Sequence, residues 1–384
     1  MIYADYNGSA PICADVKEYL INRLETGPFA NPNSIHQLGQ KTLMGMENAR
    51  AVSAKLLGCL PKNIIFNSGS TEGISHVFYS VLTDAKEDQI IITSGIEHSA
   101  VVKVCKHWAH KRNLQLMIIP TLENGVIDLE TLKGWVKEYG SRIATITVMA
   151  ANNETGAIQP FKEISALCTD DNIPFICDTT QIIGKEPFSF KESGADFAFL
   201  SGHKLGALTG SGLIMAKDVT KLKPLIIGGG QEKDLRGGTQ NYLGNETIAV
   251  GLTYFQKMSE KLHNLREARD KFEARLLKSF PEAVVISKDA PRVASTTYIS
   301  LPGIHGQAVQ IELESQGIFV TTSSACSDNE PSTSKVLKSM GVTDDVGRGV
   351  VRISLGLCSP LEWYETIGDA MIAAYEKLSK IKSF

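Results

Sequence analysis

The sequence predicts an α/β fold in which helices cover both faces of a largely parallel β-sheet. Short apolar, β-branched runs alternate with longer stretches of helical period through the first two thirds of the chain, which is typical of such sheets. A length of 384 residues, 43% of them hydrophobic, is enough for one large domain and a smaller one. In sheets of this kind, ligands bind at the carboxyl ends of the strands.

The order of the apolar runs predicts the elements. Strands are expected at residues 64–66, 90–93, 116–120, 143–150, 174–178, 197–201 and 212–216. Between them, a helical period predicts helices at residues 71–82, 100–112, 128–138 and 160–169. A charged helical segment at 253–279 leads to a mixed α/β region that ends in a helix at 361–381. We therefore expect a large domain with a seven-stranded, mostly parallel sheet and a smaller α/β C-terminal domain.

Composition and charge exclude several classes of function. The formal net charge is -3, and lysines and arginines are spread along the chain without a basic run, so nucleic acid is not expected as a main partner. No apolar stretch is long enough to cross a bilayer, and residues 1–5 carry neither a basic leader nor an apolar signal core. We expect a cytoplasmic protein without a membrane partner.

Cysteine usage directs attention to one thiol. The seven cysteines are odd in number and contain no Cys-x-x-Cys pair, so they form neither a disulfide framework nor a zinc-finger spacing, and no metal site is expected. Most lie inside apolar stretches, where cysteine acts as a small buried hydrophobe. Cys326 instead lies in the polar, turn-forming run 321–331, which predicts an exposed loop.

Two predicted strands end in residues that could bind a cofactor. The run 197–204 ends on small residues and Lys204, whose partly desolvated amine could form a Schiff base at the sheet edge. The run 175–181 contains Asp178, and a carboxylate there could keep the ring nitrogen of pyridoxal 5'-phosphate (PLP) protonated. Each also has an ordinary alternative, since a lysine can extend to the surface and an aspartate can cap a turn.

Three further segments follow predicted strands. Ser70 and Thr71 precede a helix, where backbone N–H groups and hydroxyls can bind a phosphate, although the same run is an ordinary capping sequence. His98 follows the strand at 90–93 and could stack on a planar ring. Residues 151–156 follow another strand and offer amide donors. Taken together, five strand ends each supply a group that bound PLP needs.

Together these segments resemble one family along nearly the whole chain. The family is the cysteine desulfurases of the NifS/IscS type, which are class V aminotransferase-like enzymes. The segments that carry the resemblance are Ser68-Gly69-Ser70-Thr71-Glu72, Glu97-His98-Ser99-Ala100-Val101, Asn152-Asn153-Glu154-Thr155-Gly156, Ser201-Gly202-His203-Lys204, Gly228-Gly229-Gly230-Gln231-Glu232, Arg236-Gly237-Gly238-Thr239 and Ser324-Ala325-Cys326.

The resemblance implies a PLP-dependent transferase of fold type I that works as a homodimer, with active sites near the subunit interface. Its large PLP-binding domain would span residues 15–255. Its small domain, made of residues 1–14 and 256–384, would carry the catalytic cysteine loop.

The resemblance also implies a role for each site residue. Lys204 would hold PLP covalently, His98 would stack on the ring and help move protons, and Cys326 would accept sulfur. Arg352 would bind the substrate carboxylate, with Asn153 beside the substrate. The remaining cofactor contacts would come from Asp178 at the pyridine nitrogen, Asn153 and Gln181 at the phenolic oxygen, and Ser70, Thr71, Ser201, His203 and the neighbouring subunit's Thr239 at the phosphate.

The implied reaction converts L-cysteine to L-alanine. L-cysteine would replace Lys204 on the cofactor, Lys204 would move the α-proton, and the thiolate of Cys326 would attack the loosened sulfur, leaving a persulfide. An exposed loop suits this task, because the same sulfur must meet PLP and then an acceptor protein such as an iron–sulfur scaffold.

Two alternatives stay open at this point. A selenocysteine lyase or a small-amino-acid aminotransferase needs no loop thiol for cysteine desulfuration, so Cys326 is the discriminating feature. A PLP-fold scaffold without turnover would not need Lys204, Asp178 and Cys326 together. The sequence also departs from the family at residues 205–210, where Gly-Pro-Lys-Gly is usual, and at residues 7–10, where Asn-Ala-Thr-Thr is typical.

Overall fold

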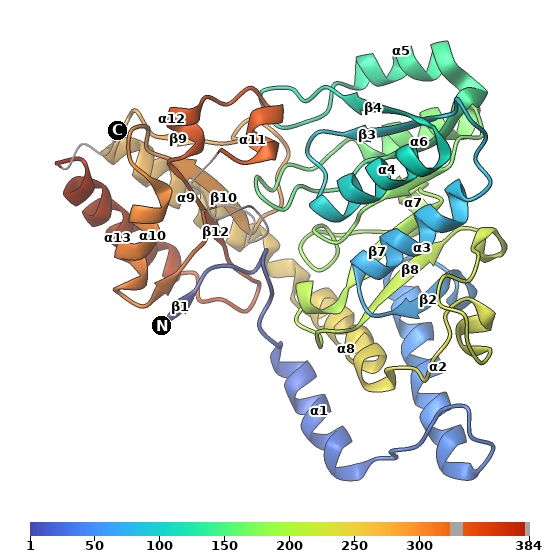
Figure 1. Cartoon of the computed structure of the whole chain (residues 1–384). Helices are drawn as coiled ribbons and strands as arrows, with labels where there is room; N and C mark the ends of the chain where they lie inside the picture. Colours follow the sequence, from blue (N-terminus) through green and yellow to red (C-terminus); the bar gives the residue numbers. More distant parts are fainter. Residues whose placement is uncertain (323–332, 381–384) are drawn as a thin grey trace.

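A seven-stranded sheet forms the centre of the larger part of the molecule (Figure 1). The computed structural model describes residues 1–322 and 333–380, so Cys326 lies outside the described residues. The strands of the sheet are β2 (Ile64–Asn67), β3 (Ile90–Ser94), β4 (Gln115–Ile119), β5 (Ile143–Thr147), β6 (Phe175–Cys177), β7 (Phe197–Ser201) and β8 (Gly212–Ala216). Each strand predicted from the sequence corresponds to one of them.

The strand order is β2-β8-β7-β6-β5-β3-β4. The strands from β7 through β6, β5 and β3 to β4 run parallel to one another, whereas β8 is antiparallel to its neighbours β2 and β7. The mostly parallel sheet is therefore confirmed. Its parallel strands bring their carboxyl ends to one edge, where the following loops collect.

Helices cover both faces of the sheet, because successive strand residues point to opposite sides. Ile65 and Ile91 face α3 (Ser70–Leu82) and α4 (Ser99–Arg112) in one apolar cluster. Phe66 and Ile92 lie in the cluster on the other side. The helices of that side are α2 (Gln37–Leu56), α5 (Leu129–Tyr139), α6 (Phe161–Asp170), α7 (Phe190–Ser193) and α8 (Tyr242–Met258).

A separate apolar core holds the smaller part of the molecule, at the left of Figure 1. Strand β1 pairs in parallel with β11, so the first residues of the chain lie with its C-terminal third. The predicted domain boundaries, after residues 14 and 255, stay a prediction. The elements here are β1 (Ile2–Tyr3), β9 (Val284–Val285), β10 (Thr296–Ser300), β11 (Ile318–Phe319), β12 (Val350–Ser354), α9 (Leu262–Ser279), α10 (Gly306–Glu314), α11 (Lys335–Ser339), α12 (Asp344–Gly347) and α13 (Trp363–Leu378).

Several helical regions differ from expectation, and α2 was not predicted although Met46 and Ala54 pack in the core of the larger part. The helix predicted at 253–279 is wrong as one element, because α8 ends at Met258 and a 3-10 turn separates it from α9. At the break, the Ser259 hydroxyl donates to the Gln256 carbonyl at 2.8 Å and competes for a helical acceptor. Helix α1 (Ala14–Thr26) was not predicted, because it buries only Val16 and Arg23 and so lacks a strong apolar stripe.

The burial of the cysteines and the character of the helices can be compared with what the sequence predicts. Cys13, Cys105, Cys168 and Cys177 are buried, as expected for small hydrophobes, whereas Cys358 is exposed. Among the helices of residues 1–322 and 333–380, none combines the length and the apolar character needed to cross a membrane.

Candidate active site

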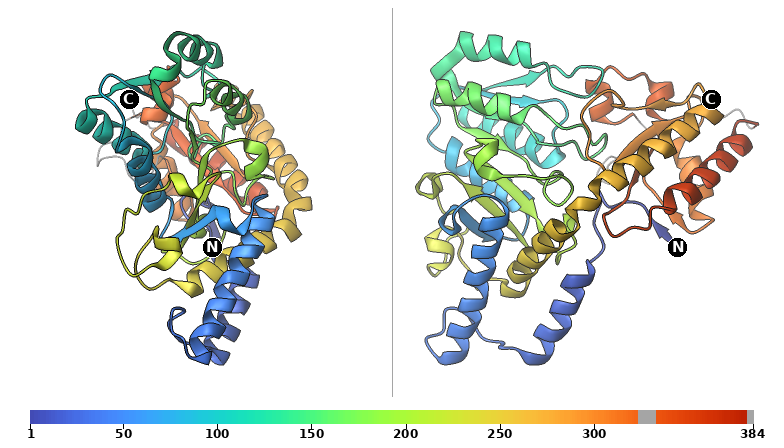
Figure 2. Two further views of the ribbon diagram at one scale, coloured as in Figure 1. Left: turned by 90° about the vertical axis from the view of Figure 1, so that its right-hand side faces the viewer. Right: turned by 180° about the vertical axis from the view of Figure 1, so that it is seen from behind.

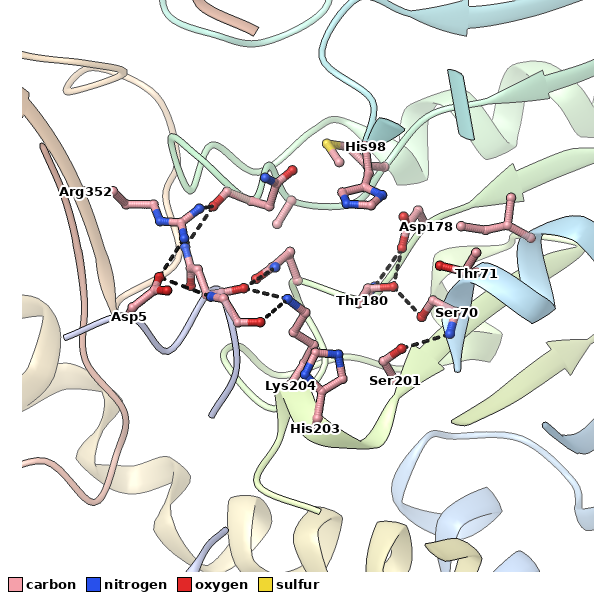
Figure 3. Close-up of a pocket in the computed structure, with 17 residues that line it drawn as sticks. Asp5, Ser70, Thr71, His98, Asp178, Thr180, Ser201, His203, Lys204 and Arg352 are labelled. Carbon is pink, nitrogen blue, oxygen red and sulfur yellow. Dashed lines mark hydrogen bonds and ion pairs between the residues drawn. The ribbon is translucent and has the colours of Figure 1, made fainter. Parts of the chain in front are cut away.

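A cavity of 260 Å³ opens at the carboxyl edge of the sheet, between the larger and smaller parts of the molecule (Figure 3). Every site residue predicted from the sequence lines it, except Thr239 and Cys326. Apart from Arg352, which comes from another sheet, these residues meet because parallel strands end at the same edge. The residues that line the cavity are Asp5, Asn7, Gly8, Ser70, Thr71, Ile74, His98, Met149, Ala151, Asn153, Asp178, Thr180, Gln181, Ser201, His203, Lys204 and Arg352.

One end of the cavity is formed by the N-terminus of α3. Gly69 precedes this helix with φ of +147°, a conformation that side chains disfavour, and Gly212 passes so close that a Cβ there would lie 2.5 Å from the Gly69 Cα. The Ser70 N–H donates to the Ser201 hydroxyl at 2.8 Å. This close approach places hydroxyls from two strands beside the positive end of a helix, an arrangement suited to an anion.

A hydrogen-bonded chain joins this end of the cavity to Asp178. The Ser70 and Thr180 hydroxyls lie 2.7 Å apart, and the Thr180 hydroxyl donates to Asp178 Oδ1 at 2.5 Å. The Thr180 N–H donates to the same oxygen at 3.0 Å. Asp178 is therefore a buried carboxylate held in one orientation at the end of β6. Thr180 was not predicted as a site residue, although it stands two positions after Asp178.

His98 lies on the same wall of the cavity, at the start of α4. Its Nδ1 accepts the Ala100 N–H at 3.2 Å, so the neutral ring carries its proton on Nε2. Burial lowers the pKa of His98, and Lys204 lowers it further, while Asp178 raises it. The ring is therefore neutral near pH 7 and can donate through Nε2.

Beside His98, the carboxyl of Glu97 is fully enclosed. Burial raises the pKa of Glu97 to about 8, although its Oε1 accepts the Ser94 hydroxyl at 2.6 Å and the Met149 N–H at 2.9 Å. A protonated carboxyl therefore supports the wall that carries His98 and Met149.

Lys204 extends from the 3-10 turn after β7 (Gly202–Lys204) into the cavity. Its Nζ donates to the Asn7 carbonyl at 2.7 Å and to the Gly8 carbonyl at 2.6 Å. His203 contacts the same N-terminal segment, because its Nδ1 lies 3.1 Å from the Ser9 hydroxyl. The N-terminal segment thus closes the cavity next to the lysine.

Arg352 reaches the cavity from β12, on the opposite side (Figure 3). Its Nη1 donates to the Asn153 carbonyl at 2.8 Å, and its Nη2 pairs with Asp5 Oδ1 at 2.6 Å. Arg352 is buried, so its guanidinium is a rigid cation facing the site. Asp5 was not predicted as a site residue, yet it already holds the group expected to bind a carboxylate.

The residues that sequence reasoning missed come mainly from the N-terminal segment. Asn7 is buried and donates through Nδ2 to the Asn153 carbonyl at 3.1 Å and to Thr296 Oγ1 at 3.0 Å. Its N–H donates to the Ser354 hydroxyl at 2.9 Å. Asn7 therefore joins loops of the larger part to strands of the smaller part. A small polar residue near a chain end carries no periodic signal, and the segment 7–10 matches the family's Asn-Ala-Thr-Thr only in part, so this role was not assigned to Asn7.

Two predicted residues are not brought to the cavity. Thr239 is exposed on the segment before α8, which fits its predicted action on a neighbouring subunit but does not test it. Cys326 lies outside the described residues. The segments that flank it do approach the site, because Thr321 forms a bridge with Arg352 and the Tyr298 hydroxyl donates to the Thr322 carbonyl at 2.9 Å.

His203 is expected to weaken the fold in acid. Burial, with the charges of Lys204 and Lys185, lowers its pKa to about 4 from 6.5. Between these values the unfolded chain binds more protons than the native state, so native stability falls as pH is lowered from about 6.5 to about 4. The loss between pH 7 and pH 5, measured by urea unfolding of the protein without added cofactor, should be smaller in His203→Gln.

Comparing the variant with the parent isolates this effect. Glu97 titrates in the opposite direction, since its raised pKa favours the native state at low pH, but it is present in both proteins. An equal loss of unfolding free energy in the two proteins would contradict the assignment of a neutral His203.

Comparisons with known proteins identify the family. The family model described as aminotransferase class-V matches residues 2–362. The cysteine desulfurase IscS of Dictyoglomus turgidum is 32% identical over 390 residues, covering 100% of this chain and 96% of the relative. The cysteine desulfurase NifS of Azotobacter vinelandii is 32% identical over 358 residues, covering 92% and 87%.

Solved structures agree with the sequence matches. A NifS-like protein superposes with a TM-score of 0.87 at 32% identity, covering 99% of both chains. A NifS-like protein from Rickettsia africae ESF-5 gives a TM-score of 0.84 at 28% identity, again covering 99% of both chains. The chain belongs to the class-V aminotransferase family and, within it, to the cysteine desulfurases of the IscS and NifS type.

Proposed function

We propose that this protein binds PLP on Lys204 and transfers the sulfur of L-cysteine to Cys326 as a persulfide, releasing L-alanine. The observation that carries the proposal is the convergence of an amine, a carboxylate and a guanidinium on one cavity, from Lys204, Asp178 and Arg352. Lys204 and Asp178 follow the ends of β7 and β6, and Arg352 lies in the middle of β12. A cavity with this set can hold both a pyridine ring and an amino acid.

The cavity fits PLP in its donor set. At the α3 end, the helix N-terminus with Ser70, Thr71 and Ser201 suits a phosphate. Toward the middle, Asp178 is a buried carboxylate already oriented by Thr180, which suits a protonated pyridine nitrogen. Bound there, PLP supplies an electron sink that weakens bonds at the Cα and Cβ atoms of the substrate.

The chain's own residues then position and move protons. Lys204 would hold the cofactor, and its free amine would be the base that takes the α-proton of the substrate. His98 stacks on the ring and donates through Nε2, which its contact with the Ala100 N–H leaves as the protonated nitrogen. Asn153 and Gln181 contact the phenolic oxygen, and His203 contributes to phosphate binding beside Ser70.

Arg352 binds the carboxylate of L-cysteine. Its Nη2 already pairs with a carboxylate, that of Asp5 at 2.6 Å, so the site accepts this chemistry. A substrate carboxylate has to share Arg352 with Asp5 or replace it. Asn153 lies next to this contact and supports the substrate on the same side.

Cys326 completes the reaction as sulfur acceptor. Its flanking residues 321 and 322 contact β12 and β10 beside Arg352, which supports a short path between the loop and the substrate. From Cys326 the sulfur passes to an acceptor protein, such as an iron–sulfur scaffold.

The proposed function is tested with the wild-type protein loaded with PLP. Incubation with L-cysteine should yield alanine and, on the intact protein, one added sulfur that peptide mapping assigns to the fragment containing Cys326. Alanine without a persulfide would point to a lyase instead, and neither product would reject the proposal.

We also propose that the protein is a homodimer in which Thr239 serves the neighbouring site. The connection between α1 and α2 projects from the molecule together with the N-terminal half of α2 (Figures 1 and 2). Large apolar side chains are exposed on this projection. Phe29, Ile35 and Met44 are 55%, 96% and 70% exposed, a pattern that marks interaction surfaces. A second copy covering them would remove this apolar area from water.

Charges on this projection are expected to separate the subunits. In analytical ultracentrifugation, the molar mass of the wild-type protein should be about twice the chain mass of 41.7 kDa. The double variant Ile35→Glu, Met44→Glu should have a molar mass closer to that of one chain. Lys41→Glu, at an exposed position of the same helix, is the matched control. A monomeric wild-type protein would contradict the dimer.

A further inference from the structure

Lys185 is a buried lysine that the proposed reaction does not use. It stands on the turn after β6 and is only 6% exposed. Its Nζ donates to Asn7 Oδ1 at 2.8 Å and also to Gln181 Oε1. Both acceptors are neutral amides. Within residues 1–322 and 333–380, no carboxylate pairs with Lys185 at ion-pair distance.

The environment of this amine is unfavourable for a charge. Burial lowers the pKa of Lys185 well below its usual value, Lys204 and Arg352 lower it further, and Asp5 is the charged group that raises it. An amine buried without a carboxylate partner destabilises a fold. We therefore look for a role of Lys185 in its hydrogen bonds with Asn7 and Gln181 at the site.

Those contacts close a ring of hydrogen bonds beside Lys204. Gln181 Nε2 donates to the Asn7 carbonyl at 3.0 Å, and Lys204 Nζ donates to the same carbonyl at 2.7 Å. Lys185 contacts the two other members of the ring, through Gln181 Oε1 and Asn7 Oδ1. The amine of Lys185 thus binds the side chains of both Asn7 and Gln181, next to the contact of Lys204 with the Asn7 carbonyl.

The ring determines which way the Gln181 amide points. A glutamine amide can turn by half a rotation, exchanging its acceptor oxygen for its NH₂ group. Lys185 supplies a donor, so Oε1 has to face Lys185 and the NH₂ group has to face the Asn7 carbonyl. One N–H of that group is used by Asn7, and the second is left for the cavity that Gln181 lines.

We propose that Lys185 is a positioning residue that keeps the NH₂ group of Gln181 turned toward the cofactor. The inference rests on the proposed binding of PLP, with the phenolic oxygen near Gln181. A donor at this oxygen stabilises its negative charge and so favours loss of the proton shared between the ring and Lys204. Without Lys185, only the Asn7 carbonyl holds the amide in this orientation, so the amide turns more readily and presents Oε1 to the phenolic oxygen, which disfavours that loss.

The test is a pH titration of the visible absorption band of the PLP-loaded protein, which needs no turnover. Lys185→Met keeps the side-chain length and removes the donor, and it is expected to raise the titration midpoint by about one pH unit. Lys191→Met is the matched control, at an exposed lysine in α7 between β6 and β7, and its midpoint should equal that of the wild type.

A double-mutant cycle separates positioning from a general effect of charge. If Lys185 acts through Gln181, Lys185→Met should add little to the shift already caused by Gln181→Met. Full addition of the two shifts, or an unchanged midpoint in Lys185→Met, would overturn the inference. A wild-type protein that binds no PLP would overturn the proposed function as well, so the two failures are distinct.

Folding is checked by thermal unfolding of the PLP-free proteins. If Lys185→Met does not fold, Lys185→Leu, which also lacks a donor, takes its place and is expected to raise the midpoint in the same direction. No shift in this folded variant would also overturn the inference.

Discussion

Lys204→Ala is expected to abolish the visible absorption of PLP bound to the protein and to lower alanine production by about 10³-fold or more. The side chain is the amine at the carboxyl edge of the sheet, and it extends into the cavity shared by Asp178 and Arg352. Without it, the cofactor has no covalent anchor and the α-proton has no base. Spectra and alanine assays on the same preparations measure both losses.

The control for this variant is Lys221→Ala, at an exposed lysine outside the cavity. It should keep both the spectrum and the activity. The fold of Lys204→Ala is expected to survive, since the donors to the carbonyls of Asn7 and Gly8 that it loses lie at the edge of a cavity and not in a core. An unchanged visible spectrum in Lys204→Ala would refute the assignment of the lysine.

Cys326→Ala is expected to separate the two halves of the reaction. The variant should bind PLP with the wild-type spectrum, because the proposed cofactor contacts come from other residues, among them Lys204, Asp178 and Ser70. Alanine production from L-cysteine should fall to the background rate, since no thiolate is left to take the sulfur. Intact-mass spectrometry after incubation with cysteine should find no added sulfur.

Cys358→Ala is the matched control, because Cys358 is the exposed thiol within residues 1–322 and 333–380. It should retain both alanine production and the persulfide. Full alanine production in Cys326→Ala would instead favour a selenocysteine lyase or an aminotransferase, for which a loop thiol is not needed.

The sheet could be predicted because its strands are buried on both faces. Runs such as residues 64–66 and 197–200 are continuously apolar, and all their residues are buried in the fold. Helices that press an apolar stripe on the sheet, such as α3, were predicted for the same reason. Helix α1 escaped prediction because it has no such stripe.

The site could be predicted in part, for a related reason. Lys204, Asp178 and His98 each follow a strand, and parallel strands end at one edge, so their convergence follows from their place in the sequence. Arg352 was assigned through the family resemblance alone, since its strand belongs to another sheet. Its distance from Asn153 depends on how the two parts of the molecule pack.

By itself, the sequence determined the fold class, the strands and the family, because apolar runs and short motifs are local features that can be recognised along the chain. Only the tertiary structure decided which polar side chains from other parts of the chain lie next to Lys204, Gln181 and Arg352. Asp5, Asn7 and Lys185 are polar residues without a periodic signal, and hydrogen bonds between distant parts of the chain bring them together. Such long-range contacts depend on packing geometry, which no local pattern encodes.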